Sequence, residues 1–140
     1  MRVREKQALV RGGFTLMEML VVVAIIVVLA GAAVPMYLRY LDDARVSRAK
    51  IDCQSLTTAV EAYKVKYGDY PASLDALATQ QPDGTPPYME RDKLLDPWQH
   101  AYQYAPQGPH NAALGKPDIW SLGPRMNDPN AQIGNWSAGT

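Results

Sequence analysis

This chain of 140 residues contains few cysteines and histidines, and neither positive nor negative charge is in excess. It holds one cysteine, Cys53, so no internal disulfide can form and the fold must be held by packing or by another device. The two histidines, His100 and His110, stand in no metal-ligand or catalytic-triad spacing, and each is expected to be a solvated polar residue. No basic patch with interleaved aromatic residues occurs, which argues against nucleic-acid binding. Composition therefore gives no support for an enzyme.

Charge is absent from one long stretch, with a single exception. Between Phe14 and Val34 lie 21 residues, of which Glu18 alone is charged. A helix of this length spans roughly 30 Å, the thickness of the hydrocarbon core of a bilayer. An acidic residue at the centre of a membrane helix costs about 2.5–3.5 kcal/mol, and less toward the ends. Glu18 therefore either lies close enough to the interface to stay hydrated, or it has a partner.

The net charge of zero is unevenly distributed along the chain. The residues before the apolar run carry four basic side chains and one acidic side chain, a charge of +3, so the rest of the chain carries −3. Basic residues in front of a membrane segment predict a cytoplasmic N-terminus, with the remaining chain on the far side. A secretory signal has its small-residue cleavage site after the apolar region, whereas here the pair Gly12-Gly13 precedes it. A cut at this pair would remove a basic leader and keep the apolar segment.

This junction resembles the prepilin signal of the type IV pilin superfamily. The matching residues are Gly13, Phe14, the pair Thr15-Leu16, and Glu18 at the head of the apolar run. The resemblance implies that a membrane-embedded prepilin peptidase cuts after Gly13, removes residues 1–13 and methylates the new amine of Phe14. It also implies that in an assembled filament Glu18 meets the amino group at Phe14 of a neighbouring subunit and so sets the register.

Beyond the apolar run, apolar side chains recur at helical spacing. Steps of three and four residues connect Val46, Ala49, Cys53, Leu56, Val60, Tyr63 and Tyr67. This stripe predicts an amphipathic helix over 36–67 that continues the membrane segment 14–35, giving one helix from about Thr15 to Tyr67. Gly31 and Pro35 in its middle predict a kink or a melted segment. Because Cys53 lies on the stripe, it is expected to be a small buried hydrophobe rather than a reactive thiol.

The C-terminal half predicts a small sheet that packs on this stripe. A turn at 68–71 ends the helix, and Ser73 is expected to cap a short helix over 73–79. Strand-like segments at 101–104, 118–121 and 133–137 predict an antiparallel sheet over about 101–137. The expected fold is α+β, with a long N-terminal helix, membrane-embedded in its first half, packed on three short strands within a head of residues 36–140.

Three C-terminal segments narrow the resemblance. The stretches LLDPWQHAYQY, DIWSLGP and IGNW are similar to segments of the G-type family, the major pseudopilins of type II secretion. That family has a type IV pilin-like fold, and the missing C-terminal cysteine pair argues against a typical type IV pilin. The resemblance implies a structural subunit of the pseudopilus, a periplasmic filament that drives protein export across the outer membrane. Implied partners are further copies of the chain, minor pseudopilins, the inner-membrane assembly platform and the prepilin peptidase.

The loop between the last two strands departs from the family pattern. The family binds calcium there through aspartates and backbone carbonyls, whereas this chain has Arg125 where an aspartate is expected. Asp128, with Asn127 and Asn130 as neutral oxygen donors, is a weak ligand set for an ion that takes six to eight oxygens. We therefore expect no cofactor. Arg125 is expected either to clip the loop by pairing with Asp128 or Asp118, or to stand as a solvated loop residue.

Alternatives to a major pseudopilin stay open at this point. A type IV pilin-like subunit for adhesion or DNA uptake, or a minor pseudopilin, would fit the same signal, although minor subunits tend to vary at the Glu18 position or carry larger heads. An uncleaved bitopic membrane protein with a binding head would need neither the Gly13-Phe14 junction nor a helix continuous with its anchor. An enzyme is the weakest reading, because the pair Asp42-Asp43 and the two histidines are more simply solvated polar residues.

Overall fold

A computed structural model describes residues 12–136 of the chain. Most of the expected leader and the last residue of the expected third strand lie outside this range. The chain divides into two compact units, the first ending at Tyr40 and the second beginning at Leu41.

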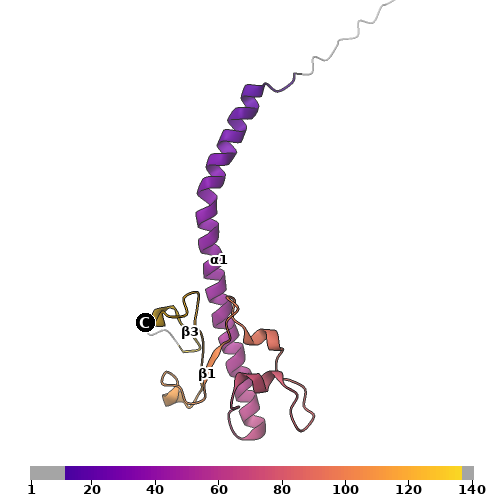
Figure 1. The fold of residues 1–140 in the computed structure, drawn as a ribbon, viewed down its shortest axis with the longest axis vertical. Helices are drawn as coiled ribbons and strands as arrows, with labels where there is room; N and C mark the ends of the chain where they lie inside the picture. The colour runs from indigo at the N-terminus through magenta and orange to yellow at the C-terminus, as the bar shows by residue number, and fades with distance from the viewer. Residues whose placement is uncertain (1–11, 137–140) are drawn as a thin grey trace, which may run out of the picture. The chain divides into compact units, whose positions relative to one another are not determined.

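One helix, α1 (Leu16–Tyr67), contributes to both units and begins and ends within a residue of its predicted limits. Its ribbon is unbroken in Figure 1. Pro35 lies inside it, so of the two predicted alternatives the melted segment is not found, and the kink stays a prediction. The physical reason is that one proline removes a single helical hydrogen bond and has a φ close to the helical value, while alanines on the N-terminal side favour the helix.

The part of α1 in the first unit exposes its apolar side chains. Its most apolar 18-residue window has a mean hydropathy of 2.8, and 0% of that window is buried within the protein. The helix is long and apolar enough, by length and composition, to cross a membrane. An apolar surface of this length has to be covered, either by lipid or by other helices.

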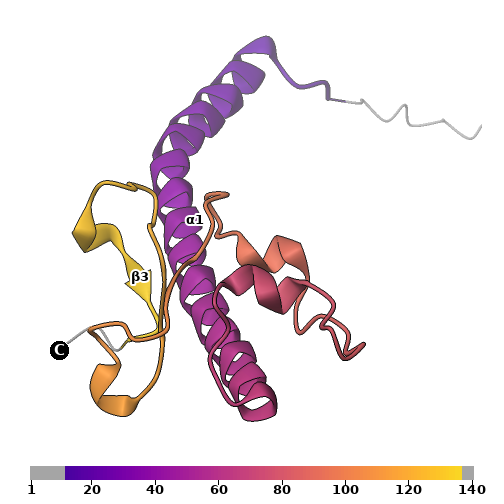
Figure 2. The ribbon, with the colours of Figure 1, turned by 60° about the horizontal axis from the view of Figure 1, so that its bottom comes forward.

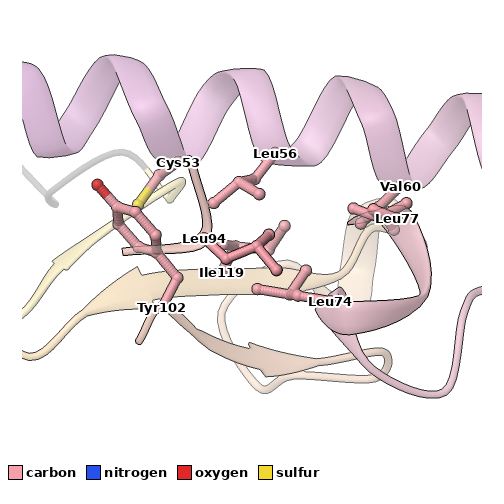
Figure 3. Packing of buried hydrophobic residues seen from close by; sticks show 8 residues of the cluster. All are labelled: Cys53, Leu56, Val60, Leu74, Leu77, Leu94, Tyr102 and Ile119. Atoms are coloured by element: carbon pink, nitrogen blue, oxygen red, sulfur yellow. The ribbon is translucent and has the colours of Figure 1, made fainter. Parts of the chain in front are cut away.

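The core of the second unit lies against the stripe predicted for α1. Ala49, Cys53, Leu56 and Val60 are buried, while Val46 at the start of the stripe is 41% exposed. Figure 3 shows the α1 side chains pointing toward side chains of the segments that follow the helix. The buried cluster consists of Cys53, Leu56, Val60, Leu74, Leu77, Leu94, Tyr102 and Ile119. The middle of the predicted stripe thus forms the core, whereas Val46 at its start is exposed and Tyr63 and Tyr67 at its end are only partly buried.

Two short 3-10 helices, η1 (Leu74–Ala78) and η2 (Arg91–Leu94), follow α1. Figures 1 and 2 show them on one side of the C-terminal half of α1, with strand β3 on the other side. The short helix expected over 73–79 is therefore present, but it is shorter than expected and is a 3-10 helix. The expected cap at Ser73 is wrong, because its side chain makes no capping hydrogen bond and its backbone carbonyl accepts from the N–H of Ala76 at 3.3 Å.

The sheet has three antiparallel strands in the order β1 (Gln103–Ala105), β2 (Asp118–Ser121), β3 (Ile133–Gly134). Tyr104 pairs with Ile119, and Ser121 pairs with Ile133. Two further 3-10 turns, η3 (Ala112–Leu114) and η4 (Pro129–Ala131), lie in the loops between the strands. The α+β prediction of a long helix on a small three-stranded antiparallel sheet is confirmed.

Two strand limits differ from the prediction. The first strand was expected at 101–104, but Ala101 forms an isolated bridge with Leu95, and pairing with β2 begins only at Gln103. A tight turn at Gln99, with a φ of 67°, directs Ala101 toward Leu95. The third strand ends at Gly134. The backbone N–H of Asn135 still donates to the carbonyl of Ile119 at 2.9 Å, but the N–H of Ile119 donates to the side-chain Oδ1 of Asn135 instead of to a backbone carbonyl.

The thiol of Cys53 provides a test of this core. Its side chain is fully buried, Sγ donates to the carbonyl of Ile133 at 3.4 Å, and burial raises the pKa of the thiol to about 12. At about pH 8 only about one thiol in ten thousand would then be ionised. We expect a maleimide reagent to leave the folded chain unlabelled and to label it completely in denaturant. Rapid labelling of the folded chain would contradict this packing.

Candidate functional site

The first turn of α1 is closed by a reciprocal cap between Thr15 and Glu18. The backbone N–H and the hydroxyl of Thr15 donate to Glu18 Oε2 at 2.9 and 3.2 Å, and the N–H of Glu18 donates to Thr15 Oγ1 at 3.2 Å. This is the capping box, which stabilises the start of a helix. The sequence reasoning did not consider it, although the spacing T-x-x-E signals it. Glu18 therefore has a role within its own helix, in addition to any role between subunits.

The cap leaves part of the Glu18 carboxylate available. Both contacts from Thr15 go to Oε2, and Oε1 takes part in none of the hydrogen bonds found among residues 12–136. An anion in the first helical turn is also favoured by the helix dipole. Phe14 is 80% exposed, and a Cβ added at Gly13 would meet nothing within 4 Å. The junction is thus open to an enzyme, and one carboxylate oxygen is open to a cation.

In the second unit, Asp118 does not face Arg125, so the expected alternative pairing of these two residues is wrong. Asp118 is 0% exposed, and its carboxylate accepts from the backbone N–H groups of His110 at 2.9 Å and Asn111 at 3.0 Å. A Cβ on Gly108 would collide with the same carboxylate, so the chain passes close to it. The β1–β2 connection is therefore wrapped around one buried charge.

His110 and Trp136 extend this arrangement. His110 Nδ1 lies 3.1 Å from Asp118 Oδ2, and its ring stacks on Trp136 with the centroids 3.9 Å apart and 9° between the planes. His110 is exposed, as expected for a solvated polar residue, but its backbone and its ring are also engaged with Asp118 and Trp136. His100 differs, because it is partly buried: its backbone N–H donates to Asp96 Oδ1 at 2.8 Å, whereas its ring Nδ1 lies 3.7 Å from Asp96 Oδ2 and has no hydrogen-bond partner among residues 12–136.

Asn135 connects α1 to the sheet. Its Oδ1 accepts from Asn111 Nδ2 at 3.0 Å and from the N–H of Ile119 at 3.1 Å. Its Nδ2 donates to Thr57 Oγ1 at 2.8 Å and to the carbonyl of Pro117 at 2.9 Å. All four hydrogen-bonding positions of the amide are used. No sequence pattern indicated this role, because the partners are as far as 78 residues away along the chain.

A second buried carboxylate, Asp96, holds the turn before β1. Oδ1 accepts from the N–H groups of Trp98 at 2.9 Å and His100 at 2.8 Å. Oδ2 accepts from Ser121 Oγ at 2.5 Å, and Ser121 Oγ in turn accepts from the N–H of Gly123 at 2.9 Å. Asp96 thereby joins this turn to the end of β2. The sequence contained it within a family-like segment but gave no indication of its contacts.

The loop between β2 and β3, in which the family's calcium site is expected to be degenerate, holds an ion pair. Arg125 Nη2 lies 3.2 Å from Asp128 Oδ2, with the two side chains 75% and 32% exposed, and Asp128 Oδ1 accepts from the N–H of Asn130 at 3.0 Å. Asn127 and Asn130 are themselves exposed. Across residues 12–136, no three His, Cys, Asp or Glu side chains lie together as a metal site would require. Among the side chains of residues 122–132, Asp128 alone carries a carboxylate, and Arg125 pairs with one of its oxygens.

Two models of known protein families match successive parts of the chain. Residues 10–34 match the model of the prokaryotic N-terminal methylation motif. Residues 36–136 match the model of type II secretion system (T2SS), protein G. The chain belongs to the type II secretion protein G family. This pseudopilin is, like its family, a structural component of the type II secretion system, and the methylation motif together with its apolar helix indicates anchoring in the inner membrane.

Individual relatives agree with the family match. Over 140 residues, the pseudopilin is 35% identical to the type II secretion system core protein G of Pseudomonas aeruginosa, covering 90% of this chain and 95% of that protein. It is 38% identical to the protein of the same name from Pectobacterium carotovorum, covering 89% and 84%. The crystal structure of the major pseudopilin from the type 2 secretion system of enterohaemorrhagic Escherichia coli superposes with a TM-score of 0.54 at 28% identity, covering 74% and 92%.

The predicted resemblance to the G-type major pseudopilins is thereby confirmed. Relatives matched over nearly their whole length carry the name core protein G, which decides against the type IV pilin-like and minor-pseudopilin alternatives. The uncleaved alternative concerns processing, and it is addressed by experiment below.

Proposed function

We propose that the pseudopilin is the repeating subunit of a periplasmic filament whose growth drives protein export across the outer membrane. The observation that carries this proposal is the apolar half of α1, of which 0% of the most apolar window is buried within the protein. Such a helix is stable in lipid before assembly and against the helices of other copies afterwards. The chain is proposed to work by assembly and not by catalysis, since the two buried carboxylates found among residues 12–136, Asp96 and Asp118, are both committed to holding loops.

Processing at the first unit is the second element of the proposal. A prepilin peptidase cuts after Gly13 and methylates the amine of Phe14, leaving a membrane and filament segment at 14–35 and a head at 36–140. The match to the methylation motif and the exposure of Phe14 support this division. The basic residues of the leader favour a cytoplasmic N-terminus and a periplasmic head.

The third element is the register between subunits. A new amine at Phe14 is a cation, and Glu18 Oε1 is free of the cap to Thr15. In the low dielectric of packed helices, an unpaired carboxylate is costly and an opposite charge on a neighbour is strongly attractive. Other partners are proposed from the family alone, namely minor pseudopilins and the inner-membrane assembly platform.

The experiment compares two adjacent glycines in a strain deleted for its own copy of the gene. A Cβ at either Gly12 or Gly13 would meet nothing within 4 Å, so valine at either position leaves the fold unaffected. The wild-type chain and Gly12→Val are expected to have the mass of Phe14–Thr140 plus one methyl group and to restore secretion. Gly13→Val is expected to keep its leader and to restore nothing. Secretion restored by a chain that retains Met1 would contradict the proposal and favour an uncleaved anchor.

A further inference from the structure

We propose that the β2–β3 loop of this pseudopilin, residues 122–132, is closed by its own hydrogen bonds and takes no divalent cation. The closure is centred on Asp96 and Ser121. It concerns the fold of the head alone, so it stands or falls independently of how the chain assembles.

The first step is the contact at the start of the loop. Ser121 Oγ lies between two groups, donating to Asp96 Oδ2 at 2.5 Å and accepting from the N–H of Gly123 at 2.9 Å. Asp96 and Ser121 are both buried. A hydrogen bond to a charged, buried acceptor is among the stronger kinds found in proteins. The loop therefore leaves β2 already fixed to the turn that precedes β1.

The second step is the contact between the two ends of the loop. Gly123 has a φ of 72°, and a Cβ there would collide with the carbonyl oxygen of Ala131. Only glycine combines this backbone conformation with so close an approach. The ends of the loop thus lie directly against each other, and no ion is needed to bring them together.

The third step concerns the oxygens inside the loop. The carbonyl of Arg125 accepts from the N–H of Asp128 at 3.0 Å, and the carbonyl of Asp128 accepts from the N–H of Ala131 at 2.9 Å. The Asp128 carboxylate is occupied by Arg125 and by the N–H of Asn130. A cation placed here would displace these donors and face a guanidinium, whose positive charge repels it. The arginine adds a surface ion pair, whereas most of the closure comes from the buried serine.

The test measures thermal unfolding of the full chain in detergent micelles, followed by tryptophan fluorescence, with excess EGTA or with millimolar calcium. A cation at a hundredfold excess over its Kd would raise the midpoint of a head of this size by about 10 °C. We expect the two midpoints to agree within about 1 °C, a small fraction of that shift. A fall of several degrees in EGTA would overturn the proposal, whatever the variants do.

Matched variants test the serine. Ser121→Ala leaves a buried carboxylate oxygen and an N–H without partners, and we expect a midpoint lower by about 10 °C that calcium does not restore. Ser55→Ala is the control, because Ser55 is exposed and its hydroxyl donates to the carbonyl of Ile51 in its own helix. This variant is expected to change the unfolding midpoint little. Recovery of the unfolding midpoint of Ser121→Ala by calcium, or an equal effect of both variants, would overturn the proposal.

Should Ser121→Ala fail to fold, calorimetric titration of the wild-type chain with calcium decides. Absence of binding heat supports the proposal, and saturable binding heat overturns it.

Discussion

Replacing Glu18 by glutamine is expected to reduce filament formation by at least about tenfold while leaving the start of α1 intact. Glutamine has the same size and serves equally well in a capping box, so the contacts to Thr15 are retained. Only the negative charge is lost. Removing one partner of a buried, hydrogen-bonded charge pair costs about 2–5 kcal/mol, and 1.4 kcal/mol is already a factor of ten. The measurement is the number of filaments seen by electron microscopy in cells that overproduce the chain.

The matched control is Thr15→Ala, which removes the capping hydroxyl but keeps the charge. Losing a cap costs about 0.5–2 kcal/mol of helix stability, a cost that lipid and neighbouring helices reduce further. Thr15→Ala is therefore expected to assemble nearly as well as the wild-type chain. The opposite ranking, with Glu18→Gln assembling normally and Thr15→Ala failing, would show that Glu18 works only within its own helix. The intact masses of both variants establish that neither result arises from failed processing.

Replacing Asp118 by alanine is expected to lower the free energy of unfolding by about 3–5 kcal/mol. The side chain is fully buried and accepts hydrogen bonds from two backbone N–H groups, those of His110 and Asn111. Alanine leaves these donors buried without partners and also releases the ring of His110, on which Trp136 stacks. Domains are stable by only about 5–15 kcal/mol, so the loss is a large fraction of the total. Denaturant unfolding of the full chain in micelles measures it.

Two further aspartate variants make this result specific. Asp118→Asn keeps the size of the side chain but replaces one acceptor oxygen by an amide donor that faces N–H groups. Its free energy of unfolding is therefore expected to lie between those of the wild-type chain and Asp118→Ala. Asp75→Ala changes an exposed aspartate of η1 and is expected to alter stability by less than about 0.5 kcal/mol. A loss below about 1 kcal/mol for Asp118→Ala would show that the β1–β2 connection does not depend on this carboxylate.

The long helix could be predicted from the sequence because its signal is local. Residues three and four positions apart share a face of a helix, so the stripe from Ala49 to Val60 indicated both the element and its buried side. Strand β2 was placed at its observed limits for a similar reason, since Ile119 and Trp120 form a short strand-like segment that follows Pro117 and precedes Gly123. The ends of β1 and β3 were not predictable in this way. The bridge of Ala101 to Leu95 and the side-chain bond of Asn135 to Ile119 decide where they lie.

The polar contacts of the head were even harder to predict from the sequence than the strand ends. An ion pair between Arg125 and Asp128 spans three residues of one loop, and it was among the pairings considered from the sequence. The roles of Asp96, Asp118 and Asn135 depend on groups that only the folded chain brings together. The capping box between Thr15 and Glu18 was missed for another reason. Its T-x-x-E spacing is visible in the sequence, but Glu18 was interpreted only as a contact between subunits.

The passage of α1 through Pro35 has a mechanical consequence. Pro35 has no N–H to donate to the carbonyl of Gly31, four residues earlier, and glycine is itself a poor helix former. Under a pull along its axis, the helix is therefore weakest between these two residues. An extended residue spans about 3.3 Å against about 1.5 Å in a helix, so a few residues here can lengthen a subunit while its head stays folded. In the filament proposed above, each subunit is therefore expected to lengthen in this segment before its head unfolds.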